Sequence, residues 1–187
     1  MGPSPARLDG VVIPSIRTDR LELVSLSPLF IDAILAGRRK EAERVAGLQL
    51  PEDWPDEHDA RFLRMRLGQL RSDPRWQEWL ARAMVLRTMG RPMTGYVGFH
   101  GPPDVIGRAE MGYTVRPRFR RKGYATEAAK ALMEWARMQH GVTSFYLSIS
   151  PQNTASLAMA AKLGFRQVGE QIDEEDGLEL VFELVVG

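Results

Sequence analysis

The most chemically informative stretch of the chain is a basic loop that ends at a glycine. Residues 116–122 hold five Lys or Arg side chains and lead into Gly123. Alanine and leucine recur at helical spacing over residues 125–136, which predicts a helix that begins at the glycine. The free N–H groups and dipole of a helix's first turn attract anions, and a glycine lets a phosphate approach the backbone. The stretch predicts an anion site suited to a pyrophosphate, with a solvated basic loop as the alternative.

A second polar group stands at the start of another predicted helix. Asn153 is the only asparagine in the chain, and Ser156 follows it. An Asx turn or a helix cap explains Asn153 as well as a ligand contact does, and the two roles are compatible.

Composition excludes several classes of protein. Among 187 residues, 25 Lys and Arg balance 24 Asp and Glu, and cysteine is absent. A net charge of +1 gives no broad attraction for nucleic acid or an acidic membrane, and no apolar run reaches the length of a membrane helix. The lack of thiols excludes disulfides, thiolate zinc sites and cysteine nucleophiles, and it fits a cytoplasmic protein. His58, His100 and His140 lack metal-ligand spacing, so no catalytic metal is expected.

The spacing of apolar residues predicts the elements that position these groups. Residues 1–15 read as a flexible leader, and residues 16–187 as a single domain. The expected strands cover residues 19–24, 83–87, 94–99, 110–115, 144–148, 166–172 and 179–186, and the expected helices cover 29–46 with a break near Gly37, 58–70, 123–140 and 155–163.

The order of these elements defines the fold class. A helix between the strands at 110–115 and 144–148 implies that they are parallel, whereas the hairpins imply antiparallel pairs. We therefore expect an α/β (α+β) fold: a single mixed, mostly antiparallel sheet with a central parallel strand pair and helices on both faces.

Three segments together resemble the GNAT superfamily of N-acetyltransferases. Arg120, Gly123 and Ala125 match its acyl-CoA loop pattern, Arg/Gln-x-x-Gly-x-Gly/Ala. The run Gly-Tyr-Ala-Thr-Glu-Ala at 123–128 is similar to the branch that acetylates ribosomal-protein N-termini, as is Thr-Asp-Arg-Leu at 18–21. Residues 153–165, with Asn-x-x-Ser and then Lys-Leu-Gly-Phe, resemble the family's following helix. The likeness covers roughly residues 17–186, more loosely over 38–80.

The resemblance implies acetyl-CoA (coenzyme A) as the acyl donor. Its pyrophosphate would lie on the amides around residues 121–126, and its pantetheine arm between the strands at 110–115 and 144–148. The residues implied in binding are Tyr113, Thr114, Val115, Arg120, Arg121, Lys122, Gly123, Tyr124, Ala125, Thr126, Asn153 and Ser156.

Two positions depart from the family pattern. Many members carry glycine where Arg121 stands. Ala160 occupies the helix position at which much of the superfamily has a tyrosine that protonates the departing thiolate. Ser156 lies one turn earlier on the same helix face and is the alternative partner for the sulfur.

The implied reaction is direct attack of a neutral amine on the thioester, which requires a base. Glu110 is the first candidate for this base. The alternative is that Glu110 has a structural role, as a carboxylate at the strand edge that pairs with an arginine. Asp173, Glu174 and Glu175 are further candidates, although a solvated acidic turn explains them more simply.

The sequence does not determine which amine accepts the acetyl group, or whether the protein is an enzyme or a binding module. The loops at 48–55 and 101–107 are expected to shape the amine pocket, for a protein N-terminus or a small-molecule amine. The alternative to an enzyme is a non-catalytic acyl-CoA-binding or sensor module. A nucleoside-triphosphate site at Lys122 and Gly123 lacks the P-loop spacing. We expect no nucleic-acid or membrane partner. The sequence neither predicts nor excludes a homodimer.

Overall fold

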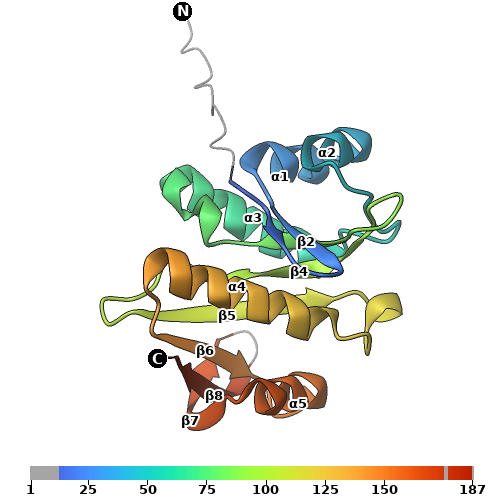
Figure 1. The fold of residues 1–187 in the computed structure, drawn as a ribbon. Coiled ribbons are helices and arrows are strands. Elements are labelled where there is room, and N and C mark those ends of the chain that lie inside the picture. Colours follow the sequence, from blue (N-terminus) through green and yellow to red (C-terminus); the bar gives the residue numbers. More distant parts are fainter. Residues whose placement is uncertain (1–12, 175–176, 187) are drawn as a thin grey trace, which may run out of the picture.

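The computed structural model describes residues 13–174 and 177–186, which form one eight-stranded sheet in the order β1-β2-β3-β4-β5-β6-β8-β7 (Figure 1). The strands are β1 (Ile16–Arg17), β2 (Leu21–Ser25), β3 (Arg82–Leu86), β4 (Met93–Phe99), β5 (Arg108–Val115), β6 (Ser144–Ile149), β7 (Arg166–Asp173) and β8 (Gly177–Val185). Only β5 and β6 pair in parallel within this sheet. The mixed sheet with a central parallel pair, predicted from the order of elements, is confirmed.

The helices cover both faces of the sheet. They are α1 (Pro28–Leu35), α2 (Arg39–Ala46), α3 (Glu57–Ser72), α4 (Tyr124–His140) and α5 (Thr154–Leu163), with short 3₁₀ turns η1 (Pro74–Glu78) and η2 (Pro117–Phe119). Helices α1–α3 pack with β3 and β4 in one apolar core. Helices α4 and α5 pack with β5 and β6 in a second core on the opposite face. The helix break predicted near Gly37 is confirmed, because that residue takes a left-handed φ of 73° between α1 and α2.

The side chains of β5 alternate between the two faces of the sheet. Successive side chains of a strand point to opposite faces. Ala109 and Met111 are buried against α4 and α5, and Tyr113 packs on the same core. Glu110 points the other way, toward the face on which α3 lies. The strand therefore presents different chemistry on its two sides.

The parallel pair separates after a few residues. Strands β5 and β6 are paired over Arg108–Glu110 and Ser144–Tyr146. Beyond that point β5 continues to Val115 alongside β4 only. Backbone groups of β5 that face the opening are therefore available to a ligand, at the place where the sequence predicted the pantetheine arm.

The N-terminal part of the sheet contains a strand that the sequence did not predict. Strand β1 was not predicted, because two residues are too few to show alternation. Residues 1–12 of the predicted leader lie outside the described residues. Within the described ranges, no helix is long and apolar enough to cross a bilayer.

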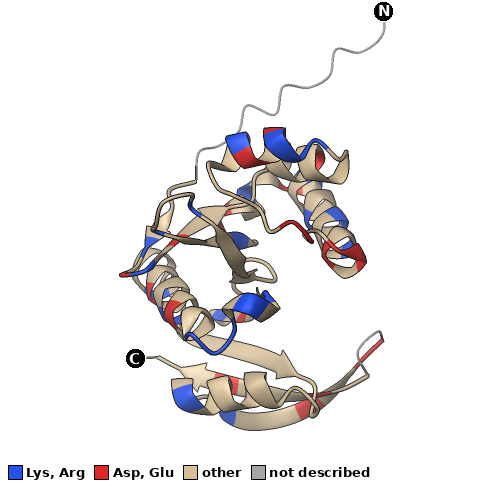
Figure 2. Ribbon diagram, turned by 90° about the vertical axis from the view of Figure 1, so that its right-hand side faces the viewer, with Lys and Arg blue, Asp and Glu red and all other residues tan. Residues whose placement is uncertain are grey.

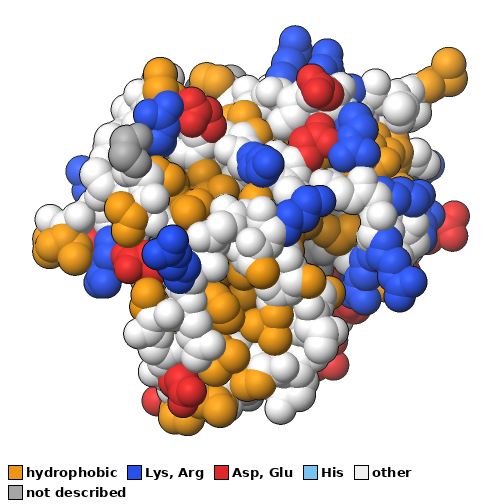
Figure 3. Space-filling model, turned by 60° about the horizontal axis from the view of Figure 1, so that its bottom comes forward, with side chains coloured by type: hydrophobic (Ala, Val, Ile, Leu, Met, Phe, Trp, Pro, Cys, Tyr) orange, Lys and Arg blue, Asp and Glu red, His pale blue; other side chains and the backbone are white. Residues whose placement is uncertain are grey.

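The β7–β8 hairpin forms an edge with exposed apolar side chains. Val168, Ile172, Leu178 and Val185 are all largely accessible. Figure 3 brings this end of the molecule forward and shows hydrophobic side chains spread over its centre.

Candidate active site

A cavity of about 640 Å³ lies between the end of β5, the start of α4 and the start of α5. All of the predicted cofactor residues except Lys122 line it: Tyr113, Thr114, Val115, Arg120, Arg121, Gly123, Tyr124, Ala125, Thr126, Asn153 and Ser156. Phe119, Ala155, Met159 and Lys162 complete the lining. The two sequence segments thus meet around one space.

The backbone before α4 forms an open helix start. Gly123 is the N-cap residue with φ 80°, and no side chain among the described residues caps the helix. Its first-turn N–H groups and positive dipole end face the cavity and suit an anion. Arg121 also takes a left-handed φ, of 61°. That conformation costs a non-glycine residue ~1–3 kcal/mol.

Two basic side chains of the loop make contacts within the protein. The Arg120 Nε donates to the Val115 carbonyl at 2.9 Å. The Lys122 ammonium lies 5.7 Å from the centre of the Phe119 ring. Arg120 therefore contacts the end of β5, and Lys122 lies on the ring of Phe119, which itself lines the cavity.

An ion pair that the sequence did not reveal holds this loop in place. The Arg20 guanidinium lies 2.6 Å from Glu127 Oε2, and Thr18 donates to Glu127 Oε1 at 2.6 Å. Arg20 also donates to the Lys122 carbonyl at 2.9 Å and lies over the Tyr124 ring. Residues before β2 are thereby tied to the first turn of α4.

Glu127→Gln is expected to loosen this tie. Burial opposes ionisation of Glu127, but the hydrogen bonds from Thr18 and Arg20 outweigh it and hold its pKa below the ordinary value of 4.5. The stabilisation is therefore complete above pH 4.5 and is lost as pH falls through the lower folded-state pKa. We expect a loss of ~1–2 kcal/mol in the free energy of unfolding at neutral pH, measured by urea denaturation.

The matched control is Glu134→Gln on the same helix, whose carboxylate pairs with Arg137 at an exposed site. Because solvent screens this exposed pair, no measurable loss of stability is expected. An equal loss in both variants would show that the Arg20–Glu127 pair has no special role.

The start of α5 carries the second predicted group. The Asn153 Oδ1 accepts from the Ser156 N–H at 3.2 Å, so the predicted cap is present while Asn153 still lines the cavity. Ala160 is fully buried in the core. Ser156, one turn earlier, is the residue of this face that reaches the cavity.

The Tyr113 hydroxyl is a feature that the sequence did not single out. It is shielded from solvent and has no hydrogen-bond partner of acceptable geometry among the described residues. Burial raises its pKa, with the nearby Ser156 side chain acting in the opposite sense, so the hydroxyl keeps its proton at neutral pH. A buried unsatisfied hydroxyl costs ~1–3 kcal/mol, and a polar ligand atom in the cavity would satisfy it.

Glu110 is held by partners other than the expected arginine. The His100 Nδ1 lies 3.1 Å from Oε2, and Ser148 donates to Oε1 at 2.8 Å. Burial opposes ionisation of Glu110, but these hydrogen bonds outweigh it and lower its pKa. The carboxylate is therefore charged at neutral pH. It lies where β5 and β6 separate, on the side of the sheet opposite the cavity.

A buried arginine fixes the end of β5 to α3. Arg116 pairs with Asp56 at 3.4 Å, with Asp59 at 3.1 Å and with Asp53. Figure 2 shows the basic loop before α4 close to the acidic start of α3. Burial raises the pKa of Asp59, so that carboxylate depends on Arg116 for its charge balance. Arg116 was predicted only as part of the basic loop, yet its charge is used inside the protein.

Other candidate groups do not join the cavity. Asp173 and Glu174 lie at the β7–β8 turn, and Glu175 lies outside the described residues. In the part of the chain that the structure describes, no three His, Cys, Asp or Glu side chains are grouped to hold a metal ion.

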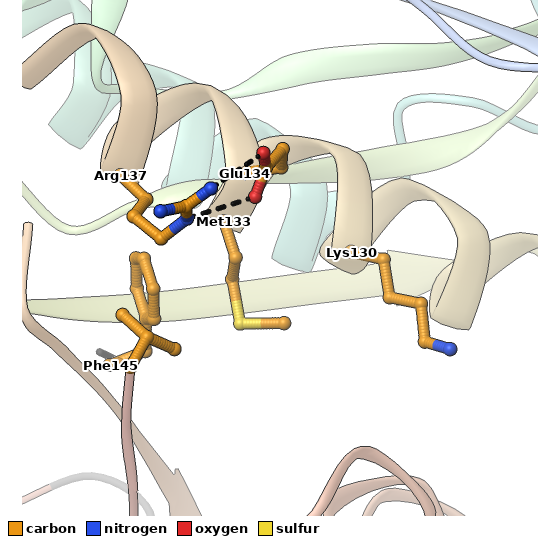
Figure 4. Close-up of a pocket in the computed structure, with 6 residues that line it drawn as sticks. Lys130, Met133, Glu134, Arg137 and Phe145 are labelled. Carbon is orange, nitrogen blue, oxygen red and sulfur yellow. Dashed lines mark hydrogen bonds and ion pairs between the residues drawn. The ribbon is translucent and has the colours of Figure 1, made fainter.

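A separate hollow between α4 and the start of β6 carries no comparable chemistry (Figure 4). It is lined by Lys130, Met133, Glu134, Arg137, Phe145 and Val186. Its Arg137 and Glu134 already pair with each other at 3.0 Å. None of the predicted site residues lies there.

Comparison with known proteins agrees with the fold and the cavity. The profile of the Acetyltransferase (GNAT) domain family matches residues 20–166. YjdG of Bacillus subtilis (strain 168), an uncharacterized N-acetyltransferase, is 26% identical over 153 residues, which are 80% of this chain and 88% of the relative.

Solved structures share the same fold. A putative ribosomal-protein-serine acetyltransferase from Vibrio cholerae superposes with a TM-score of 0.66 at 20% identity, covering 94% of this chain and 99% of the other. A ribosomal L7/L12 α-N-protein acetyltransferase, RimL, solved with coenzyme A, superposes with a TM-score of 0.63 at 17% identity, covering 92% and 98%.

The chain belongs to the GNAT acetyltransferase family. It is an acetyl-CoA-dependent N-acetyltransferase. The resemblance read from the loop and helix segments is confirmed at the level of family, fold, cosubstrate and enzyme class.

Proposed function

We propose that the chain transfers an acetyl group directly from acetyl-CoA to a primary amine, with the cavity between β5, α4 and α5 as the cosubstrate site. The observation that carries this assignment is the open N-terminus of α4 beside the separated strands β5 and β6. Within the cavity, the amides of residues 121–126 would hold the pyrophosphate, and Tyr113–Val115 would pair with the pantetheine arm. Asn153 and Ser156 would face the cosubstrate from α5.

The residues present fit this cosubstrate. The cavity has an uncapped helix start and a glycine at the N-cap on one side, and it is also lined by Tyr113, whose buried hydroxyl is unpaired within the described residues. Bound acetyl-CoA supplies an activated thioester carbonyl. The chain's own part is to orient that group, to accept the proton of the amine and to stabilise the departing sulfur.

The acceptor is proposed to be an amine at a protein N-terminus or on a small molecule. The names of the Vibrio and RimL structures favour a ribosomal-protein terminus as the first class to try. The split between β5 and β6 begins beyond Glu110 and Tyr146, where their pairing ends. Because the cavity lies on the α4 and α5 side, we assign the opposite side, with Glu110 and the loop at 101–107, to the acceptor.

The proposed function is tested by acetyl-CoA turnover against a panel of amines, read as thiol release. The panel would contain peptides with free N-termini, amino acids, polyamines and aminoglycosides, with N-terminally blocked peptides as matched controls. Amine-dependent thiol release supports the proposal. Tight CoA binding without release from any amine would instead support the non-catalytic binding module.

Ser156→Ala and Tyr113→Phe are expected to lower turnover more than affinity. Both residues line the cavity, and the Tyr113 hydroxyl remains protonated. A thiol with an ordinary pKa near ~8.5 leaves tolerably without an acid, so we expect a ~10-fold fall in kcat for each variant. The Kd for CoA, measured by calorimetry, should change less than ~3-fold. Because Tyr113→Phe removes an unsatisfied buried group, it should not destabilise the fold. Unaltered kcat in both variants would remove these hydroxyls from the mechanism.

We also propose a cellular location and a mode of assembly. The absence of cysteine supports a cytoplasmic location. The apolar edge at β7–β8 is compatible with the homodimer left open by the sequence, since an exposed edge strand invites pairing.

A further inference from the structure

A histidine stands beside the carboxylate that the sequence offered as the base. His100 directly follows β4, and its N–H donates to the Glu110 carbonyl at 2.9 Å. This pairing brings the imidazole across the strand to the Glu110 side chain, with Nδ1 at 3.1 Å from Oε2. The opposite oxygen of the carboxylate accepts from Ser148 at 2.8 Å. Glu110 is thus held from both sides, and one side is an imidazole.

The other imidazole nitrogen is directed at the separation of β5 from β6. A Cβ placed on Gly112 would lie 2.9 Å from His100 Nε2, so any side chain at this position would collide with the ring. Gly112 lies just past Glu110, the last residue of β5 that pairs with β6. The next residue, Tyr113, points into the cosubstrate cavity from the opposite face of the strand. Nε2 therefore stands on the acceptor side of the strand, across from the cavity.

The two groups differ in their access to solvent and in their suitability as a base. The His100 side chain is 49% exposed, whereas that of Glu110 is 20% exposed. The Glu110 pKa is lowered by its partners, which makes this carboxylate a weak acceptor for an amine proton. Imidazole is the side chain whose ordinary protonation equilibrium lies nearest neutral pH.

Arg66 holds this arrangement from α3. It donates to the His100 carbonyl at 3.3 Å and to Gln69 at 2.9 Å. Arg66 is 5% exposed, and burial lowers its pKa to about 10, so it remains charged at neutral pH. Its positive charge faces the same region as the Glu110 carboxylate. The backbone of His100 is held by these contacts, while its side chain remains half exposed.

We propose that His100 Nε2 is the atom that takes the proton from the acceptor amine, and that Glu110 is the positioning residue that holds Nδ1–H. This inference rests on the proposed function. The amine nitrogen uses its lone pair to form the bond to the acetyl carbon, and the carbon–sulfur bond breaks with its electron pair on sulfur. The proton that the nitrogen loses passes to Nε2 and from there to solvent. Glu110 stays ionised throughout.

The kinetic test compares His100→Gln with Glu110→Gln, using the amine that gives the highest turnover. Loss of the base is expected to lower kcat by ~10²–10³-fold in His100→Gln. Loss of orientation is expected to lower kcat by only ~10-fold in Glu110→Gln. The matched control is His58→Gln, at an exposed position of α3, which should leave kcat unchanged. Calorimetric Kd values for CoA should be the same in all variants, because none of these residues lines the cavity.

The second measurement needs no turnover. ¹⁵N-imidazole NMR of the full chain should show neutral His100 protonated at Nδ1, with that preference lost in Glu110→Gln and kept in His58→Gln. Neutral His100 protonated at Nε2 in the unmutated chain would overturn the proposal, as would a larger kcat loss in Glu110→Gln than in His100→Gln. Failure of every amine to release thiol, while CoA still binds, would overturn the proposed function itself and this proposal with it.

Discussion

Gly123→Asp is expected to abolish CoA binding while leaving the chain folded. Gly123 is the uncapped N-cap of α4, with φ 80°. Aspartate is a favoured N-cap residue, and its carboxylate would occupy the free first-turn N–H groups. It would also stand against the pyrophosphate. Two unit charges ~6 Å apart at an effective dielectric constant of ~20 repel by ~2.8 kcal/mol, so the Kd for CoA should rise ~100-fold or more.

Two further variants separate charge from strain at this position. An added Cβ would lie 3.4 Å from the Arg20 guanidinium, in a backbone region that side chains rarely adopt. Gly123→Ala has the Cβ and the strain without a capping group, and Gly123→Asn adds a neutral capping group. We expect ~10-fold weaker binding in each by calorimetry. CoA affinity in Gly123→Asp equal to that of Gly123→Asn would contradict the pyrophosphate assignment.

Arg116→Met is expected to cause the largest loss of stability. The variant would leave Asp59, whose side chain is 2% exposed, without its cationic partner. Removing one member of a buried ion pair costs ~3–5 kcal/mol, which urea denaturation at neutral pH would measure. Burial already raises the Asp59 pKa, and loss of Arg116 raises it further. Since a carboxyl with a raised folded-state pKa favours the folded state more as it becomes protonated, part of the loss should be regained as pH falls.

The control for this prediction lies in the same loop. Arg118 is exposed and lies over the Phe119 ring, so Arg118→Met should change the free energy of unfolding by less than ~0.5 kcal/mol. Adding Asp59→Asn to Arg116→Met should recover part of the loss, because the uncompensated carboxylate is then removed. Equal stability of Arg116→Met and Arg118→Met would show that the acidic start of α3 does not depend on Arg116.

Local patterns were sufficient to predict most of the fold. Alternation and helical spacing report on neighbours along the chain, so the strands around the split and both cavity helices were predicted within a few residues. The parallel pair followed from the helix between its strands. The two-residue β1 was missed because such a short strand shows no period.

The parts of the site that escaped prediction depend on contacts between distant residues. Arg20 and Glu127 are 107 positions apart, and no spacing rule joins them. His100 reaches Glu110 only through the register of β4 against β5, which the spacing of apolar residues leaves undetermined. Arg116 and Arg120 looked like loop charges, yet one is buried among aspartates and the other donates to Val115. The sequence shows which side chains are charged, but it does not show which residues they pair with.

The most direct test of the cosubstrate site is a crystal structure of the full chain soaked with CoA. The account predicts the pyrophosphate on the N–H groups of residues 121–126, with the pantetheine arm passing between β5 and β6 beside Tyr113–Val115. Density for CoA at another place, such as the hollow between α4 and the start of β6, with the first turn of α4 free of phosphate, would contradict it.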